Sequence, residues 1–201
     1  GMSIDVMGPP WSVPLVARMP EVRRGIPLAI GHGDFALGAR RALGRSLRAA
    51  GYDRAIVLPR SFKSALVPWF AGIPVRTGFA AELRGLLLND VRRLDRRVLD
   101  QTVKRFLALG VPAGAALPAP PTPVLRVDAA NREALLARLG LGRRPAVALM
   151  PGAAYGPAKQ WPIGNVTALA RQLAGRGFEI WVLGSGGEQG LGEQIRSGAG
   201  A

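Results

Sequence analysis

A lysine at the end of a loop of small residues is the group in this sequence best suited to binding a phosphate. The apolar run 146–150 predicts a short buried strand that Pro151 and Gly152 terminate, and Lys159 closes the loop that follows. Apolar residues then recur at helical spacing over 166–173, so a helix comes next. Loop N–H groups and a helix N-terminus carry partial positive charge and the lysine adds a full one, so the segment predicts a phosphate cradle.

A second glycine-rich loop repeats this strand–loop–helix pattern further along the chain. The apolar run 178–183 predicts a strand, 184–188 a loop and 189–196 a helix. An acidic residue placed like Glu188 binds ribose hydroxyls in nucleotide-binding folds. The simpler interpretation of Glu188 is an acid that the macrodipole favours at a helix N-terminus.

The first loop also has a plain structural interpretation. A lone lysine such as Lys159 is usually a solvated surface residue. Small residues at 152–154 form many ordinary strand-to-helix turns, and Trp161 is expected to pack rather than to bind a ligand. His32 is expected to be a hydrogen-bonded loop residue rather than a catalyst.

The elements that would position these loops alternate along the whole chain, which favours an α/β fold with parallel sheets. Before the loops, the sequence predicts strands and helices in turn, at 3–7, 11–19, 26–30, 37–50, 55–58, 62–70, 75–79, 101–109 and 131–139. Residues 111–123 hold five prolines, four alanines and no charge, which is typical of a linker. We therefore expect a first domain over 1–110, a linker over 111–124 and a second domain over 125–201.

Charge and composition limit the classes of partner. The formal net charge is +14, with 18 basic and 8 acidic residues in 1–110, so an anionic partner is expected on the first domain. The sequence has no cysteine and a single histidine, which excludes disulfides, thiolate metal sites and a His-rich metal site. It also lacks an apolar run of transmembrane length and a signal-peptide pattern at its start.

The first loop closely resembles the donor-side loop of the ADP-heptose:lipopolysaccharide heptosyltransferases, the type II enzymes in particular. The residues that carry this likeness are Pro151-Gly152-Ala153 and Tyr155-Gly156-Pro157-Ala158-Lys159-Gln160-Trp161-Pro162. The first half of the chain resembles the same family at 4–7, 18–22, 31–33, 52–54, 61–68, 70–74, 76–78 and 87–92. The likeness therefore covers nearly the whole chain except the proline-rich linker.

The resemblance implies two Rossmann-like domains that face each other across a cleft, the GT-B arrangement, both incomplete in this chain. The family's Gly-Asp pair with its catalytic base would precede Gly1, and its Asp-Ser-Gly diphosphate loop would follow Ala201. The catalytic base is therefore not assigned here, and we expect this chain alone to be inactive. The implied donor substrate is ADP-heptose, with no metal and no further cofactor.

The resemblance also implies site residues. Donor contacts fall to Lys159 at the phosphates and to Gly152, Ala153, Ala154, Tyr155, Gly184, Ser185 and Glu188. The acceptor is the lipopolysaccharide inner core, and its contacts fall to Ser61, Lys63, Arg60 and Arg92. A helix cap with a solvated lysine would explain Ser61 and Lys63 almost as well. A solvated helix face would explain the basic run that starts at Arg92.

These features lead to one main functional hypothesis and two alternatives. The main one is a glycosyltransferase of lipopolysaccharide biosynthesis, cytoplasmic, with peripheral contact at the inner face of the inner membrane, where anionic lipid attracts a basic surface. The first alternative is a different nucleotide-sugar enzyme of the same fold. The second is a basic nucleic-acid-binding module, which the charge favours but the scarcity of lysine and the absence of any reading motif oppose, so no nucleic-acid partner is expected.

Overall fold

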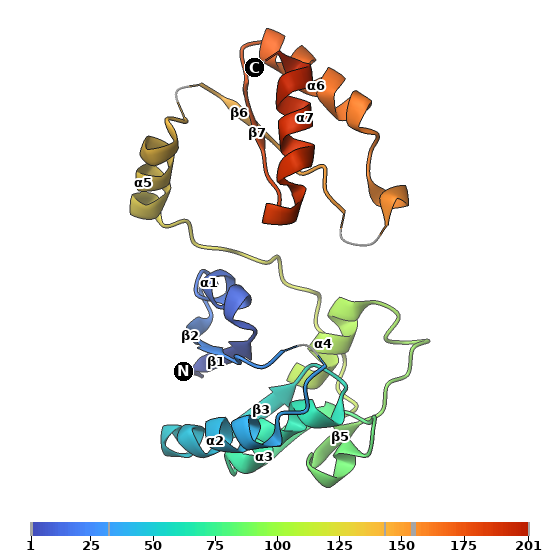
Figure 1. Ribbon diagram of the computed structural model, residues 1–201. Helices are drawn as coiled ribbons and strands as arrows, with labels where there is room; N and C mark the ends of the chain where they lie inside the picture. Colours follow the sequence, from blue (N-terminus) through green and yellow to red (C-terminus); the bar gives the residue numbers. More distant parts are fainter. Residues whose placement is uncertain (1, 32, 143, 154–155, 201) are drawn as a thin grey trace. The chain divides into compact units, whose positions relative to one another are not determined.

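All described strands of the protein pair in parallel, which confirms the predicted α/β class (Figure 1). The computed structural model describes residues 2–31, 33–142, 144–153 and 156–200. Its internal contacts divide the chain into two units, Gly1–Arg126 and Val127–Ala201. Each unit is described separately below. Three residues whose roles are considered above, His32, Ala154 and Tyr155, lie outside the described residues.

The first unit begins with a pair of parallel strands, β1 (Ile4–Gly8) and β2 (Val22–Pro27), connected through α1 (Val13–Val16). The strand expected at 26–30 thus lies earlier in the chain, which corrects that prediction. The physical reason is that Arg23 and Arg24, which make the segment look like a loop, are both bound by Asp5 of β1. Both arginine side chains are also about half exposed, so with Asp5 as a shared partner they are compatible with a strand.

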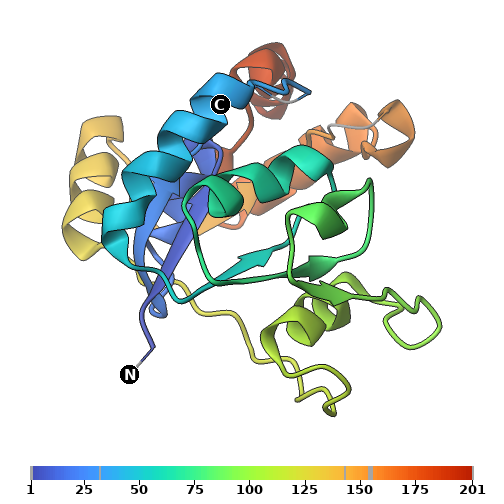
Figure 2. The same cartoon turned by 90° about the horizontal axis from the view of Figure 1, so that it is seen from below.

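A three-stranded sheet in the order β3 (Arg54–Val57), β4 (Val75–Phe79) and β5 (Asp90–Arg92) forms the rest of the first unit. Helices α2 (Leu37–Leu47) and α3 (Leu66–Phe70) lie beside one another, as Figures 1 and 2 show. Gly44 permits this approach, because a Cβ there would lie 2.8 Å from the carbonyl oxygen of Val67. α4 (Thr102–Gly110) follows the sheet.

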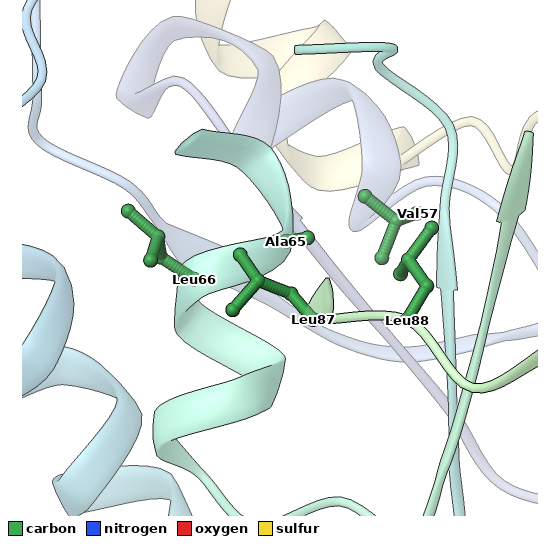
Figure 3. Packing of buried hydrophobic residues seen from close by; sticks show 5 residues of the cluster. All are labelled: Val57, Ala65, Leu66, Leu87 and Leu88. Carbon is green, nitrogen blue, oxygen red and sulfur yellow. The ribbon is translucent and has the colours of Figure 1, made fainter. Parts of the chain in front are cut away.

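The core of this sheet is built by three segments that are distant in the sequence. Val57 comes from β3, Ala65 and Leu66 from the 3₁₀ turn η3 (Phe62–Ala65) and α3, and Leu87 and Leu88 from the chain after the turn η4 (Arg84–Leu86) (Figure 3). Burial of these side chains fixes the start of α3 and the end of η4 against the sheet.

No helix or strand occurs between Gly110 and Ala129, where prolines are frequent. The segment is nevertheless attached to the first unit over part of its length. Leu117 packs against the buried cluster of Phe79, Leu99 and Leu109, and the Arg126 N–H donates to the Arg18 carbonyl at 2.7 Å.

The second unit consists of α5 (Ala129–Leu139), β6 (Ala146–Leu149), α6 (Ile163–Gly175), β7 (Glu179–Val182) and α7 (Gln189–Ala199). Its core is formed by Val166 and Ala170 of α6 together with Ile195 of α7. The two helices lie beside one another next to the strand pair (Figure 1). The apolar spacing that predicts α6 is therefore its buried face.

Candidate functional site

The two predicted loops of the second unit leave the same edge of one sheet. β6 and β7 are parallel, Leu149 is in register with Val182, and the Leu183 N–H donates to the Leu149 carbonyl at 2.9 Å. The residues after the two strands therefore emerge side by side at the carboxyl ends, where α/β sheets bind ligands. This arrangement brings Gly152 and Ala153 to the same edge as Gly184 and Ser185.

Gly152 lies directly against the side chain of Glu188. A Cβ built on Gly152 would overlap Oε1 of Glu188, and one built on Gly184 would lie 3.2 Å from the Glu188 Cβ. Only glycine therefore fits at position 152 without moving the glutamate. The two loops meet at this contact.

Glu188 binds its own loop in this structure. Its Oε2 accepts hydrogen bonds from the Ser185 N–H and the Ser185 hydroxyl, both at 2.7 Å. These two bonds, the backbone one first, hold the pKa of Glu188 below its usual range. The pair forms a capping box at the turn η6 (Gly186–Glu188).

A hollow of about 490 Å³ opens beside these loops. Pro151, Gly152 and Gly184 of the loops line it, together with the polar residues Ser185 and Glu188. Charged and apolar residues of α6, β7 and α7 complete the lining. Apolar walls with a few converging polar groups are the usual composition of a small-molecule site.

Lys159 lies in the 3₁₀ turn η5 (Pro157–Lys159), and its side chain is exposed. Its backbone N–H donates to the Gly156 carbonyl at 3.3 Å. Trp161 is half exposed and borders a second hollow together with Pro151. Lys159 therefore belongs to the connection between β6 and α6 that also carries Gly152.

In the first unit, the predicted residues Arg60 and Ser61 lie in the connection between β3 and η3, and Lys63 lies within η3. Ser61 occupies the N-cap position in extended conformation, but its side chain makes no cap hydrogen bond, which corrects the predicted cap. The Phe62 N–H is instead bound by Oε2 of Glu82 at 2.8 Å. The Glu82 carboxylate thus accepts a hydrogen bond at the start of η3, where the Ser61 hydroxyl was expected to accept one.

Arg84 is a buried residue that the sequence did not single out. Its side chain is fully buried, and its guanidinium donates to the carbonyls of Pro59 and of Val57, the latter at 3.1 Å. Burial lowers the pKa of Arg84, and the nearby charge of Arg60 lowers it further. The signal in the sequence is an arginine within the apolar run 83–88, which is unusual for a solvated residue.

Arg92 is not part of an open basic helix face, which corrects that alternative interpretation. It ends β5, its side chain is 13% exposed, and it forms a bidentate ion pair with Asp90 at 2.6 and 2.8 Å. The hydrogen bond from Arg92 is the main cause that lowers the pKa of Asp90. A contact between Arg92 and the acceptor would have to compete with the Asp90 pair. Arg93, Arg96 and Arg97, in contrast, are exposed.

Neither a cluster of metal ligands nor a membrane-spanning helix is found among the described residues. Within that part of the chain, no group of three or more acidic or histidine residues could hold a metal ion. No helix in the same residues has the length and apolarity needed to cross a membrane.

Comparison with known proteins gives consistent matches. The model of glycosyltransferase family 9 (heptosyltransferase) matches residues 40–198. Lipopolysaccharide heptosyltransferase 2 of Escherichia coli is 46% identical over 199 residues, which is 96% of this chain and 57% of that protein. Lipooligosaccharide heptosyltransferase 2 of Haemophilus influenzae is 42% identical over 203 residues, 96% of this chain and 58% of that protein.

Solved structures agree with the sequence matches. The structure of E. coli ADP-heptose lps heptosyltransferase II superposes with a TM-score of 0.84 at 42% identity and covers 97% of this chain and 59% of that one. The E. coli heptosyltransferase WaaC with ADP superposes with a TM-score of 0.68 at 23% identity, covering 98% and 63%. The second match supports the fold alone. The chain spans 57% to 58% of the length of the curated relatives it matches.

Proposed function

The chain belongs to glycosyltransferase family 9, the heptosyltransferase family, and from this we propose that it takes part in heptose transfer from ADP-heptose to an inner-core heptose of lipopolysaccharide. The identity of 46% with a lipopolysaccharide heptosyltransferase 2 supports this substrate class. The observation that carries the proposal is the pair of glycine-rich loops joined at Gly152 and Glu188.

The second unit is the proposed donor side. Departure of ADP develops negative charge on a diphosphate, and preorganised N–H groups and cations stabilise such charge. Gly152 and Gly184 lack side chains, and the Glu188 side chain occupies the space that a Cβ would fill at each of them. Lys159, on the same connection, supplies the full positive charge, so the proposed chemistry requires no metal at this position.

Glu188 is proposed to act chiefly through the loop. Its Oε2 already accepts two hydrogen bonds from Ser185, so a ribose contact through that oxygen would replace interactions that order the loop. The remaining oxygen, Oε1, faces Gly152. We therefore assign the proposed ribose contact to Oε1.

The first unit is the proposed acceptor side. Arg60, Ser61 and Lys63 follow the carboxyl end of β3, and Arg60 is exposed. The unit also carries most of the net positive charge, which suits a phosphorylated acceptor. The same charge supports a cytoplasmic protein that binds the inner face of the inner membrane peripherally, at about 1 kcal/mol per well-placed basic residue.

Turnover and binding test the proposal together. A hybrid in which this chain replaces the matched region of the E. coli relative should consume ADP-heptose in the presence of inner-core acceptor. The chain itself should bind ADP-heptose in a titration. Preference for a different nucleotide sugar would favour the first alternative, and tighter binding of duplex or single-stranded oligonucleotides than of ADP would contradict the proposal.

A further inference from the structure

Glu82, which lies just before η4, and Arg84, the first residue of η4, both bind the chain between β3 and η3. Glu82 Oε2 accepts the Phe62 N–H at 2.8 Å. Arg84 donates to the carbonyls of Val57 and Pro59. We call these contacts the 82–84 clamp. It fixes the direction of one N–H and two carbonyls that flank Arg60.

The contacts of Arg84 come at a cost in folding free energy. Its side chain is fully buried, and the partners of its guanidinium are neutral carbonyls rather than a carboxylate. Among the described residues its Nε–H has no hydrogen-bond partner. A buried charge and a buried unsatisfied donor both destabilise a fold, so packing alone does not explain this arginine.

The backbone of the clamp is strained as well. Glu82 and Leu83 have φ values of 44° and 57°, the left-handed region that residues with side chains rarely adopt. Gly78 of β4 leaves the space for the guanidinium, because a Cβ there would overlap one of its terminal nitrogens. The positive φ values of Glu82 and Leu83 and the missing side chain of Gly78 all accommodate the position of the Arg84 guanidinium.

Apolar packing already attaches the same segments to one another. Val57, Ala65, Leu66, Leu87 and Leu88 join β3, η3 with α3, and the end of η4 (Figure 3). This packing is not directional, whereas hydrogen bonds to particular carbonyls and N–H groups are. Apolar packing attaches these segments to one another, and the clamp therefore fixes the backbone position of the exposed stretch between Val57 and Phe62.

We infer that Glu82 and Arg84 are positioning residues, which set the place of Arg60, Ser61 and Lys63 for the acceptor by holding the backbone on either side of Arg60. This inference rests on the proposed acceptor role of the first unit. Glu82 and Arg84 act through the connection and leave contact with the acceptor to Arg60, Ser61 and Lys63.

Glu82→Ala is the most informative variant, because Glu82 is exposed and the change removes no buried side chain. It also removes the nearby negative charge that favours the ionised form of Arg84. The positioning role predicts faster hydrogen exchange at the Phe62 amide and several-fold weaker binding of a phosphorylated inner-core oligosaccharide, with unchanged ADP binding. Simple electrostatics predicts the opposite sign for the oligosaccharide, since removing a carboxylate from a basic face strengthens anion binding. Tighter or unchanged oligosaccharide binding would overturn the inference.

Arg84→Lys tests the other half of the clamp. A lysine ammonium lacks the planar fork that reaches two carbonyls, so the same selective loss of oligosaccharide binding is expected. Arg40→Lys is the matched control, since Arg40 is 4% exposed and also donates to two backbone carbonyls, those of Asp34 and Phe35. The control should lower the melting temperature without the selective loss. Equal losses in both variants would overturn a positioning role.

The two proposals fail in different ways. If the unaltered chain binds ADP but no inner-core oligosaccharide, the proposed acceptor role fails, and the positioning role in acceptor binding fails with it. If it binds the oligosaccharide and Glu82→Ala speeds exchange at Phe62 without weakening that binding, only the positioning inference fails.

Discussion

Gly152 and Glu188 lie in contact across the two loops at the carboxyl ends of β6 and β7, so closely that no side chain fits at position 152 beside the present glutamate. Through its other oxygen, the same carboxylate holds Ser185. One residue thus links both loops of the proposed donor side.

Gly152→Ala is expected to move the Glu188 carboxylate and weaken ADP binding several-fold. The added methyl group meets the end of a flexible side chain, so the fold should persist with a loss of about 1 kcal/mol. ADP titration and thermal unfolding measure the two effects. Gly164→Ala, at a position in α6 with open space around it, is the control and should stabilise by about 0.5 kcal/mol without affecting ADP.

Ser185→Ala should loosen the second loop. It removes the hydroxyl that donates to Glu188 Oε2 but keeps the backbone N–H bond. Loss of one such bond at a capping box costs about 1 kcal/mol. The expected result is weaker ADP binding and faster amide exchange over 184–188; unchanged exchange there would contradict the role given to Glu188.

Asp5 should make the first unit sensitive to acid. Arg23, and then Tyr52 and Arg24, hold the pKa of Asp5 far below its usual range through hydrogen bonds. A depressed folded-state pKa contributes stability that is present above the unfolded value, about 3.9, and is lost as pH falls through the folded one. Unfolding measured from pH 6 to pH 2 should therefore show a loss below about pH 4.

Asp5→Asn is the variant that isolates this contribution. The Asp5 side chain is 1% exposed, so losing its charge-assisted bonds should cost about 2 kcal/mol near neutral pH. The variant should also lose part of the acid sensitivity. Asp100→Asn, which alters an exposed pair with Lys104, should change little, and an equal effect of both variants would contradict the assignment.

Gly78→Ala should disturb the 82–84 clamp without altering either charged residue. The new methyl group would displace the buried Arg84 guanidinium, and overpacking of this kind costs about 1–3 kcal/mol. Inner-core oligosaccharide binding should weaken in parallel with the effect of Glu82→Ala. If Gly78→Ala lowers the melting temperature but leaves oligosaccharide binding unchanged, the clamp serves stability alone, which would contradict its positioning role.

Regular elements with a clear apolar pattern could be predicted from the sequence, and those that depend on charged side chains could not. β4 lies at the predicted 75–79, and β6 differs by one residue from the apolar run that predicts it. β5 was missed because two of its three residues, Asp90 and Arg92, are charged and pair with each other only in the folded chain.

In the candidate site, too, some features could be predicted from local sequence patterns and others could not. Both glycine-rich loops follow predicted strands, so their presence at one sheet edge could be predicted. The contact of Gly152 with Glu188 and the burial of Arg84 arise from residues far apart in the sequence, and no local pattern encodes them. The roles of the donor-side and acceptor-side residues remain predictions that the variants above test.

The role of Lys159 in the proposed donor site is tested by the affinity of the Lys159→Ala variant for ADP-heptose. Lys104→Ala is the matched control, since Lys104 is a lysine of the other unit that pairs with Asp100. We predict a loss of tenfold or more for Lys159→Ala, about 1.4 kcal/mol or more, with no change for the control. Equal affinities of Lys159→Ala and the unaltered chain would contradict the proposed donor site.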